Sequence, residues 1–279
     1  MRSGFITLVG RPNVGKSTLL NAMCGRKVSI VSDKPQTTRT RIRGILTTPE
    51  AQLVFVDTPG LHKPVTALGQ RVNATALDSV HDVDAVCLVI DGTQPFGSGD
   101  RWVADHLDLA SAIVIVNKTD AMKQRTVLAQ LGASSALGAS AYFPVSAKTG
   151  DGIPELVAHL SKLMPDGPMY FPGDTVSDQP EETWVAELVR EQLLAVTHDE
   201  LPYSIATRVT EWEWPRIRVE ILVERDSQKG MVIGKGGAVL KEVGQRVRAQ
   251  LPEGCFIELF VKVDKDWQRK PDRIERLGY

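Results

Sequence analysis

The chain has 279 residues, a hydrophobic fraction of 42% and a formal net charge of −1. This length predicts about two domains with real cores, and the near-neutral charge gives no global basic signal for nucleic acid. Cys24, Cys87 and Cys255 lie far apart in apolar contexts, which predicts buried thiols and argues against disulfides or a zinc site.

The start of the chain and its apolar runs predict a location. The sequence opens Met-Arg-Ser-Gly-Phe and enters a strand pattern at once, so we expect no signal peptide. The longest apolar runs, 85–90 and 112–116, have the length of strands and are too short to span a bilayer. We therefore expect a cytoplasmic protein.

Apolar runs alternate with helical patterns over the first 165 residues. Strands are predicted at 5–10, 42–48, 51–57, 85–91, 112–117 and 141–145, and helices at 16–23, 68–80, 99–110, 122–132 and 152–163. Such alternation predicts an α/β fold with a mostly parallel six-stranded sheet covered on both faces. The turn between the strands 42–48 and 51–57 consists only of Thr-Pro-Glu at 48–50. These two strands should therefore form an antiparallel hairpin at one edge of the sheet.

Residues 10–17, Gly-Arg-Pro-Asn-Val-Gly-Lys-Ser, lie between the first strand and the first helix. This pattern is typical of a phosphate-binding loop, in which backbone N–H groups surround a β-phosphate. Lys16 would reach the β- and γ-phosphates, and the Ser17 hydroxyl would ligate Mg²⁺. The predicted nucleotide contacts of the loop are Gly10, Asn13, Val14, Gly15, Lys16, Ser17 and Thr18.

Three further motifs follow strands and identify the nucleotide. Asp57, in Asp-Thr-Pro-Gly, can hold the Mg²⁺ shell, and Gly60 offers an N–H to the γ-phosphate. Asp120, in Asn-Lys-Thr-Asp, can accept two hydrogen bonds from the N1–H and N2–H₂ edge of guanine, which adenine lacks. The predicted guanine contacts are Asn117, Lys118, Asp120 and the triplet Ser146, Ala147 and Lys148.

The order of these motifs resembles the translation-factor class of GTPases over residues 5–163. Leu61 stands where many such GTPases carry a water-positioning glutamine. Because an apolar side chain cannot orient water, hydrolysis should be slow or rely on another group. In related GTPases, an asparagine at the position of Asn13 accompanies a bound potassium ion, which acts like an arginine finger. The alternative, that Asn13 only caps the loop, stays open.

Residues 35–39, Pro-Gln-Thr-Thr-Arg, resemble the first switch of these GTPases. Thr38 is the better candidate for the Mg²⁺ ligand that senses the γ-phosphate, and Thr37 is the alternative. The predicted metal ligands are Ser17, Thr38 and Asp57, and the predicted catalytic residues are Lys16, Asn13, Thr38 and Gly60.

Prolines and glycines interrupt the pattern after residue 165, which predicts a nucleotide-binding domain at 1–165, a linker at 166–180 and a second domain at 181–279. In the second domain we expect a helix at 183–196, strands at 204–212 and 217–223, a helix at 237–250 and a last strand at 255–263.

Residues 234–237, Gly-Lys-Gly-Gly, lie between two predicted helices. This loop resembles the Gly-x-x-Gly loop of KH domains, and the order of elements matches the bacterial type II arrangement, a smaller α+β fold. Such a loop lets a sugar-phosphate backbone approach closely. A glycine corner between two helices is the alternative. The predicted RNA contacts are Ile233, Gly234, Lys235, Gly236, Gly237 and Lys241.

A GTPase domain followed by one KH domain resembles the Era family over essentially the whole chain. The resemblance implies a GTP- and Mg²⁺-dependent switch of 30S ribosomal subunit assembly, with single-stranded RNA from the 3′ end of small-subunit ribosomal RNA as its partner. It also implies a cytoplasmic monomer that is partly peripheral to the inner face of the cell membrane. One alternative is a GTP-regulated protein whose second domain binds a protein or membrane surface. A small-molecule P-loop kinase is disfavoured, since it needs no guanine-reading Asn117–Asp120 motif.

Overall fold

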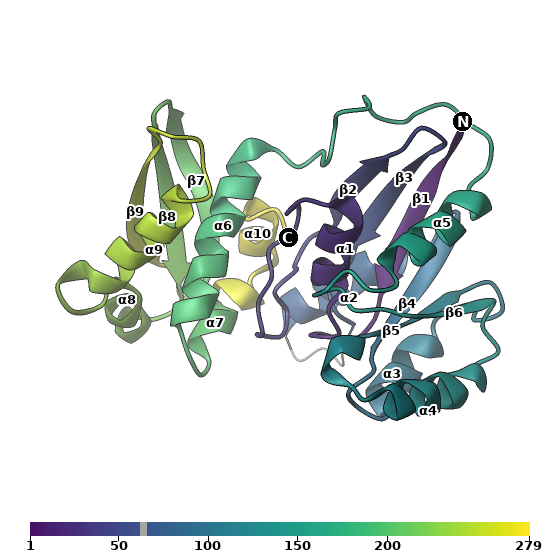
Figure 1. Ribbon diagram of the computed structural model, residues 1–279. Helices are drawn as coiled ribbons and strands as arrows, with labels where there is room; N and C mark the ends of the chain where they lie inside the picture. Colours follow the sequence, from purple (N-terminus) through teal and green to yellow (C-terminus); the bar gives the residue numbers. More distant parts are fainter. Residues whose placement is uncertain (62–65) are drawn as a thin grey trace. The chain divides into compact units, whose positions relative to one another are not determined.

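A computed structural model of the protein describes residues 1–61 and 66–279 (Figure 1). The chain forms two compact units. The first contains the N-terminal strands and Gln70–Asp178, and the second is built on Gln179–Tyr279. Each has its own hydrophobic core. None of the described helices is long and apolar enough to span a membrane.

The first unit contains a six-stranded sheet in the order β2-β3-β1-β4-β5-β6. Its strands are β1 (Arg2–Val9), β2 (Ile42–Thr47), β3 (Ala51–Asp57), β4 (Ala85–Asp91), β5 (Ile113–Asn117) and β6 (Ala141–Pro144). All neighbouring strands are parallel except β2 and β3, which form an antiparallel hairpin at one edge. The predicted α/β fold and edge hairpin are thus confirmed.

Helices cover both faces of this sheet. They are α1 (Lys16–Cys24), α2 (Ala67–Asp78), α3 (Ser98–Ala104), η1 (Thr119–Ala121), α4 (Gln124–Ser135) and α5 (Ile153–Leu163). Leu20 of α1 and Leu156 of α5 pack with Leu8 in one core cluster. Ala76 of α2 and Val103 of α3 pack with alternate strand residues in another. Because successive strand residues point to opposite faces, these two clusters lie on opposite sides of the sheet.

Helix α3 is shorter than the predicted 99–110 and ends at Ala104. Beyond it, the backbone N–H of Ser111 donates to the carbonyl of Asp108, and the Ser111 hydroxyl donates to the Asp108 carboxylate at 2.9 Å. Such local hydrogen bonds offer the backbone an alternative to the helix. The apolar periodicity that predicted a longer helix continues through these turns.

Residues 165–178 run along the first unit. Ser3 N–H donates to the carbonyl of Pro165 at 3.0 Å, and Ile45 N–H donates to that of Val176 at 2.9 Å. The Gln52 side chain donates to the carbonyl of Phe171 at 2.8 Å. This proline-rich segment is therefore tied by hydrogen bonds to β1, β2 and β3.

The second unit has a three-stranded sheet in the order β7-β8-β9, with β7 antiparallel and β9 parallel to β8. Its main elements are α6 (Glu181–Val196), α7 (Leu201–Ser204), β7 (Ala206–Glu213), β8 (Arg216–Val223), α8 (Asp226–Ile233), η2 (Lys235–Gly237), α9 (Ala238–Arg248) and β9 (Phe256–Val263). Strand β7 begins later than expected because Ser204 belongs to α7. The order matches the predicted KH arrangement.

Helices α6 and α9 cover one face of this sheet. Val189 of α6 and Val247 of α9 share a core cluster with Ile217, Val219 and Ile221 of β8. The chain ends in two elements that the sequence did not predict, η3 (Trp267–Arg269) and α10 (Pro271–Arg276). The fully buried Trp267 anchors them, since its indole N–H donates to the carbonyl of Ser204 at 2.9 Å.

Candidate nucleotide site and RNA interface

The loop between β1 and α1 depends on two glycines. Gly15 caps α1 with φ of 96°, and a Cβ there would lie 2.3 Å from the amide nitrogen of Asn117. Gly10 has φ of 155°, and a Cβ there would lie 2.4 Å from the carbonyl oxygen of Val89. Only glycine satisfies both the backbone conformation and the close approach. The N–H groups at the start of α1 therefore remain available to an anion.

Lys16 is buried at the base of this loop. Its Nζ donates to the carbonyl of Gly10 at 3.0 Å and to that of Arg11 at 2.9 Å. Burial lowers the pKa of Lys16 to about 8, and the nearby Asp57 carboxylate opposes this shift. A lysine with so little water around it gains strongly from a phosphate, because an anion restores the stability of its charged form.

Three hydroxyl groups surround the carboxylate of Asp57 at the end of β3. Ser17 Oγ donates to Asp57 Oδ2 at 2.7 Å, and Thr38 Oγ1 lies 3.0 Å from Ser17 Oγ and 3.4 Å from the same carboxylate oxygen. Ser29 Oγ donates to it at 3.1 Å. Ser29 was not predicted, since nothing in its sequence context connects it with Asp57.

This cluster fits a magnesium ion. Asp57 is fully buried, and its Oδ1 has no hydrogen-bond partner among the described residues. Burial raises the pKa of Asp57, and the opposing effects of Lys16 and of the three hydroxyl donors are too small to cancel this rise. A buried carboxylate beside two hydroxyl oxygens is the oxygen-rich, anionic setting that Mg²⁺ requires.

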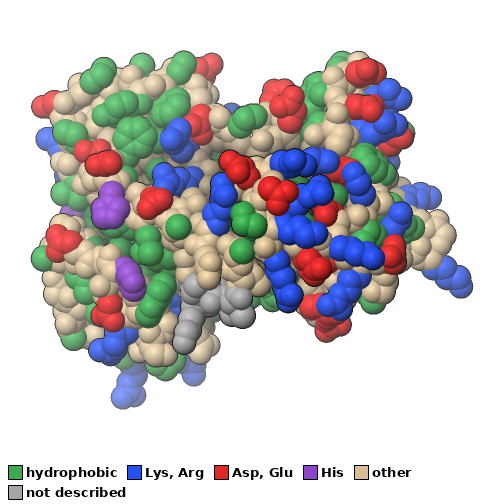
Figure 2. Space-filling model, turned by 180° about the vertical axis from the view of Figure 1, so that it is seen from behind, with side chains coloured by type: hydrophobic (Ala, Val, Ile, Leu, Met, Phe, Trp, Pro, Cys, Tyr) green, Lys and Arg blue, Asp and Glu red, His purple; other side chains and the backbone are tan. Residues whose placement is uncertain are grey.

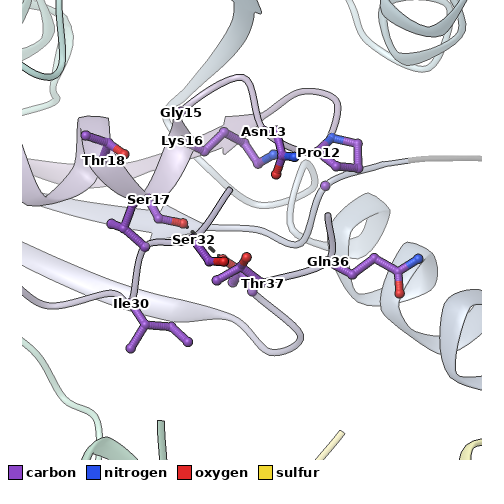
Figure 3. Close-up of a pocket in the computed structure, with 13 residues that line it drawn as sticks. Pro12, Asn13, Gly15, Lys16, Ser17, Thr18, Ile30, Ser32, Gln36 and Thr37 are labelled. Atoms are coloured by element: carbon purple, nitrogen blue, oxygen red, sulfur yellow. Dashed lines mark hydrogen bonds between the residues drawn. The ribbon is translucent and has the colours of Figure 1, made fainter. Parts of the chain in front are cut away.

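The two threonines of the first-switch segment differ in direction. Thr38 is buried against Ser17 and Asp57, whereas Thr37 Oγ1 donates to the carbonyl of Lys34 at 2.7 Å. Figure 3 shows this segment across a small pocket from Ser17, with Lys16 and Asn13 on the loop side. The pocket lies between the phosphate loop and residues 30–38.

Leu61 is only 1% exposed and packs in the core beneath β4 and β5. Its N–H donates to the carbonyl of Gly10 at 3.1 Å. The preceding Gly60 approaches the phosphate loop closely, since a Cβ there would lie 2.6 Å from the nitrogen of Pro12. The side chain that follows Asp57–Gly60 thus points into the core and away from the nucleotide loop.

Asn13 connects the phosphate loop with the residues just before the first-switch segment. Its backbone has a φ of 63°, and its side-chain amide donates to the carbonyl of Asp33 at 2.6 Å. No side-chain hydrogen bond from this loop caps α1, whose N-cap is Gly15. The side chain of Asn13 therefore joins the phosphate loop to Asp33, just before the first-switch segment.

The predicted guanine contacts meet where β5 and β6 end. Asn117 is buried, and its amide donates to the carbonyl of Val14 at 2.9 Å while its oxygen accepts from the N–H of Ala147 at 3.0 Å. Ser146 Oγ donates to the carboxylate of Asp120 at 2.7 Å. The side chain of Asn117 thus links the phosphate loop to the loop that holds Ala147. Lys148 is exposed beside them.

Lys118 adopts a φ of 68° and makes two polar contacts. Its Nζ donates to the carbonyl of Asn13 at 2.7 Å and to the carboxylate of Asp91 at 2.6 Å. Burial favours a higher pKa for Asp91, but hydrogen bonds from Lys118 and Thr93 outweigh it and lower the pKa. Asp91 was missed, although an acid at the end of a buried strand was a usable signal.

The glycine loop of the second unit is open. Gly234, Gly236 and Gly237 have φ of 74°, 61° and 80°, and a Cβ at Gly234 would lie 2.5 Å from Val239. A Cβ at either of the other two would meet nothing within 4 Å. Lys235 and Lys241 are exposed beside the loop, and Ile233 is half-buried. The geometry leaves room for a polymer backbone.

Known protein families match a part of each of the two units. Residues 5–118 match the family described as a 50S ribosome-binding GTPase, and residues 200–268 match the KH domain family. The chain is 45% identical to the GTPase Era of Mycobacterium bovis, covering 99% of this chain and 98% of the relative. It is 42% identical to that of Heliobacterium modesticaldum, covering 100% and 97%.

Two solved structures resemble the whole chain. Era in complex with MgGDPNP and nucleotides 1506–1542 of 16S ribosomal RNA is 36% identical, with a TM-score of 0.95 over 100% of this chain and 99% of that one. An Aquifex aeolicus Era variant bound to GDP and AlF4⁻ is 35% identical, with the same TM-score and coverage.

Proposed function

The chain belongs to the Era family of GTPases, and we propose that it is a GTP-driven switch that binds single-stranded RNA at the 3′ end of small-subunit ribosomal RNA during 30S assembly. The observation that carries this proposal is the joining of a guanine-nucleotide site and a KH loop in one chain that matches Era over its whole length. The family description of the first unit names the 50S subunit, but we follow the relatives that share both units.

For the nucleotide, each proposed role follows from a contact. Lys16 would neutralise the β- and γ-phosphates from the base of the loop. Ser17 and Thr38 would ligate Mg²⁺, with Asp57 holding its water shell. When bound, this ion would supply positive charge that stabilises the phosphate oxygens as the bond between the γ-phosphorus and the bridging oxygen breaks. The direction of Thr38 favours it over Thr37.

We assign the reading of guanine to Asp120, which Ser146 orients. Ala147 N–H and Asn117 position the loop around it, and Lys118 joins that loop to the phosphate loop. Because these contacts form one network, the base and the phosphates would be bound together. Gly10, Val14, Gly15, Thr18, Gly60 and Lys148 complete the proposed nucleotide site.

For hydrolysis, we propose that a potassium ion replaces the missing glutamine. Leu61 is buried and turned away, whereas Asn13 lies on the phosphate loop, where its side-chain nitrogen donates to the carbonyl of Asp33. Potassium ions bind amide and carbonyl oxygens, and the Oδ1 of Asn13 would supply one. Turnover should therefore be slow and several-fold faster in KCl than in NaCl at equal ionic strength. Equal rates in the two salts would remove potassium from the mechanism.

For RNA, we propose that Gly234–Gly237 clamps the sugar-phosphate backbone, with Lys235 and Lys241 on phosphates and Ile233 beside the bases. The proposed boundaries are a GTP-binding domain at 1–165, a linker at 166–180 and a KH domain at 181–279. We further propose a cytoplasmic monomer with peripheral association at the inner face of the cell membrane.

The decisive experiment is to crosslink the GTP-bound protein to RNA in cells and sequence the RNA. Enrichment of the 3′ end of 16S ribosomal RNA supports the proposal, and reads scattered over unrelated transcripts contradict it. The rival, a second domain that binds protein or membrane, is tested by the salt dependence of binding to the purified RNA of nucleotides 1506–1542. Only phosphate contacts release many counterions and give a steep slope.

A further inference from the structure

The second unit has a sheet face that α6, α8 and α9 do not cover. Along β8, Ile217, Val219 and Ile221 point to the helices, so Arg218 and Glu220 point to the opposite face. We call this second side the open face. It also carries their register partners on β9, Glu258 and Phe260.

A β-bulge between Val209 and Glu211 keeps charged residues of β7 on the open face. Arg208 lies opposite Glu220, and Glu211 lies opposite Arg218, although the two β7 positions are three residues apart, an odd step along the strand. Since side chains alternate along a strand, only the extra residue of the bulge lets both share one face. The charge pattern of the face therefore depends on a specific local irregularity.

A basic pocket of about 420 Å³ lies at one end of the open face. Its lining contains four cations and one carboxylate: Arg208, Lys262, Asp264, Arg273 and Arg276, with Leu222, Val263 and Leu277 as apolar lining. The cations come from three separate elements, β7, β9 and α10. In Figure 2, Lys and Arg side chains gather over the second unit, on the right of that view.

Internal ion pairs neutralise only part of this charge. The buried Glu220 carboxylate accepts from Arg208 Nε at 2.6 Å and lies 3.7 Å from Lys262 Nζ. Asp264 lies 3.5 Å from Arg273. Arg276 is exposed and forms no ion pair with any residue that the structure describes. The pocket thus keeps an excess of cations, three of which are guanidinium groups suited to bidentate contact with phosphate.

We infer that this pocket is a second phosphate-backbone site, which binds RNA that continues beyond the Gly234–Gly237 loop. The inference rests on the proposed RNA-binding function. Aromatic side chains along the same face favour RNA over a lipid surface: Phe256 is 51% exposed, and Phe260 lies with its ring centroid 5.9 Å from the Arg218 guanidinium carbon. Bases stack on such rings, whereas the phosphate headgroups of a lipid surface have no ring to stack.

The test compares two RNAs and two matched variants. The long probe is the RNA of nucleotides 1506–1542, and the short probe is its last six or so nucleotides, slightly more than the four that a KH loop clamps. Arg276→Gln removes one cation from the pocket. Arg216→Gln removes one at the other end of the open face, where Arg216 pairs with the exposed Glu213.

For the long probe, Arg276→Gln should make the slope of log affinity against log salt less steep by about 0.7. This is the contribution of one phosphate contact to the slope for single-stranded RNA. The short probe should bind unchanged, and Arg216→Gln should alter neither. Adding Lys262→Gln should lower the long-probe slope by a similar further amount. An unchanged slope in the double variant, with the wild type binding both probes, overturns the second site alone.

Other outcomes are equally informative. If the wild type binds neither probe, the proposed function itself fails and takes this inference with it. Vesicles of phosphatidylserine and phosphatidylcholine provide a second arm. If Arg276→Gln weakens binding to these vesicles while the RNA slope stays the same, the pocket is a lipid site and the inference is wrong.

Discussion

The phosphate loop and the Gly234–Gly237 loop use the same backbone device in different surroundings. In each, a glycine with positive φ caps a helix, Gly15 before α1 and Gly237 before α9. A Cβ at Gly15 would strike Asn117 at 2.3 Å, whereas one at Gly237 would meet nothing within 4 Å. The neighbouring lysines differ likewise, because Lys16 is buried and Lys235 is exposed.

This difference teaches how one phosphate-binding device serves two kinds of ligand. Enclosure desolvates Lys16 and Asp57, which strengthens every charge interaction with a single nucleotide. An open loop forgoes that strength, but it lets a chain of phosphates enter and leave at both ends. Substitutions in the enclosed site should therefore have large effects, and substitutions in the open loop moderate ones.

The largest effect is expected for Lys16→Ala. Loss of this buried charge should lower GTP turnover by about a thousandfold or more, as for other groups that stabilise transition-state charge. Single-turnover hydrolysis measures it, with the exposed Lys162→Ala of α5 as the control. RNA binding should be unaffected, and near-normal turnover would place the active site elsewhere.

Asp120→Asn should change the base that is bound. Ser146 donates to one oxygen of Asp120, so the new amide would direct its oxygen to Ser146 and its NH₂ to the base. GTP affinity should then fall by about a hundredfold, while xanthosine triphosphate gains a hydrogen bond. Fluorescent nucleotide titration measures both, with the exposed Asp151→Asn on the neighbouring loop after β6 as the control. Undiminished GTP binding would remove Asp120 from the base site.

A smaller effect is expected from pH. The pKa of Lys16 is lowered to about 8, and bound phosphates would raise it again. The protonated lysine is the form that binds, so GTP affinity should be constant below this pKa and fall as pH rises through it. Between pH 8 and pH 9 the expected loss is about fivefold. Calorimetry in buffers of different ionisation enthalpy should detect proton uptake, and none at pH 9 would contradict this account.

The sequence predicted those elements and site residues that are marked by particular residue types in a short stretch of chain. The strands, the phosphate loop, Asp120 and the glycine loop all combine a required side chain or backbone freedom with an adjacent apolar run. It missed contacts that depend on distant segments. Ser29 contacts Asp57 across 28 positions, and Asp91 contacts Lys118 across 27.

Thr37 and Thr38 have the same chemistry, so the sequence favoured Thr38 only through its resemblance to other first switches. The physical reason lies in the path of the chain, which turns Thr38 to Asp57 and Thr37 to Lys34. The C-terminal helix α10 was not predicted, and the residue just before it that anchors the segment, Trp267, donates to the carbonyl of Ser204 from 63 positions away. The bulge at Val209 and Glu211 left no signal in the strand pattern.

The central claim is that the two loops are chemically separate sites, and Gly236 tests it most directly. Gly236→Asp places negative charge where phosphate should bind, and Gly236→Asn is its neutral control. Both residue types tolerate positive φ better than others, and the structure leaves open space at this position. RNA affinity should fall at least about tenfold more for the aspartate than for the asparagine, roughly 1.4 kcal/mol. Basal GTP turnover should stay the same in both variants. Equal RNA affinity of the folded aspartate variant and the wild type would contradict the account and leave this loop as only a corner between two helices.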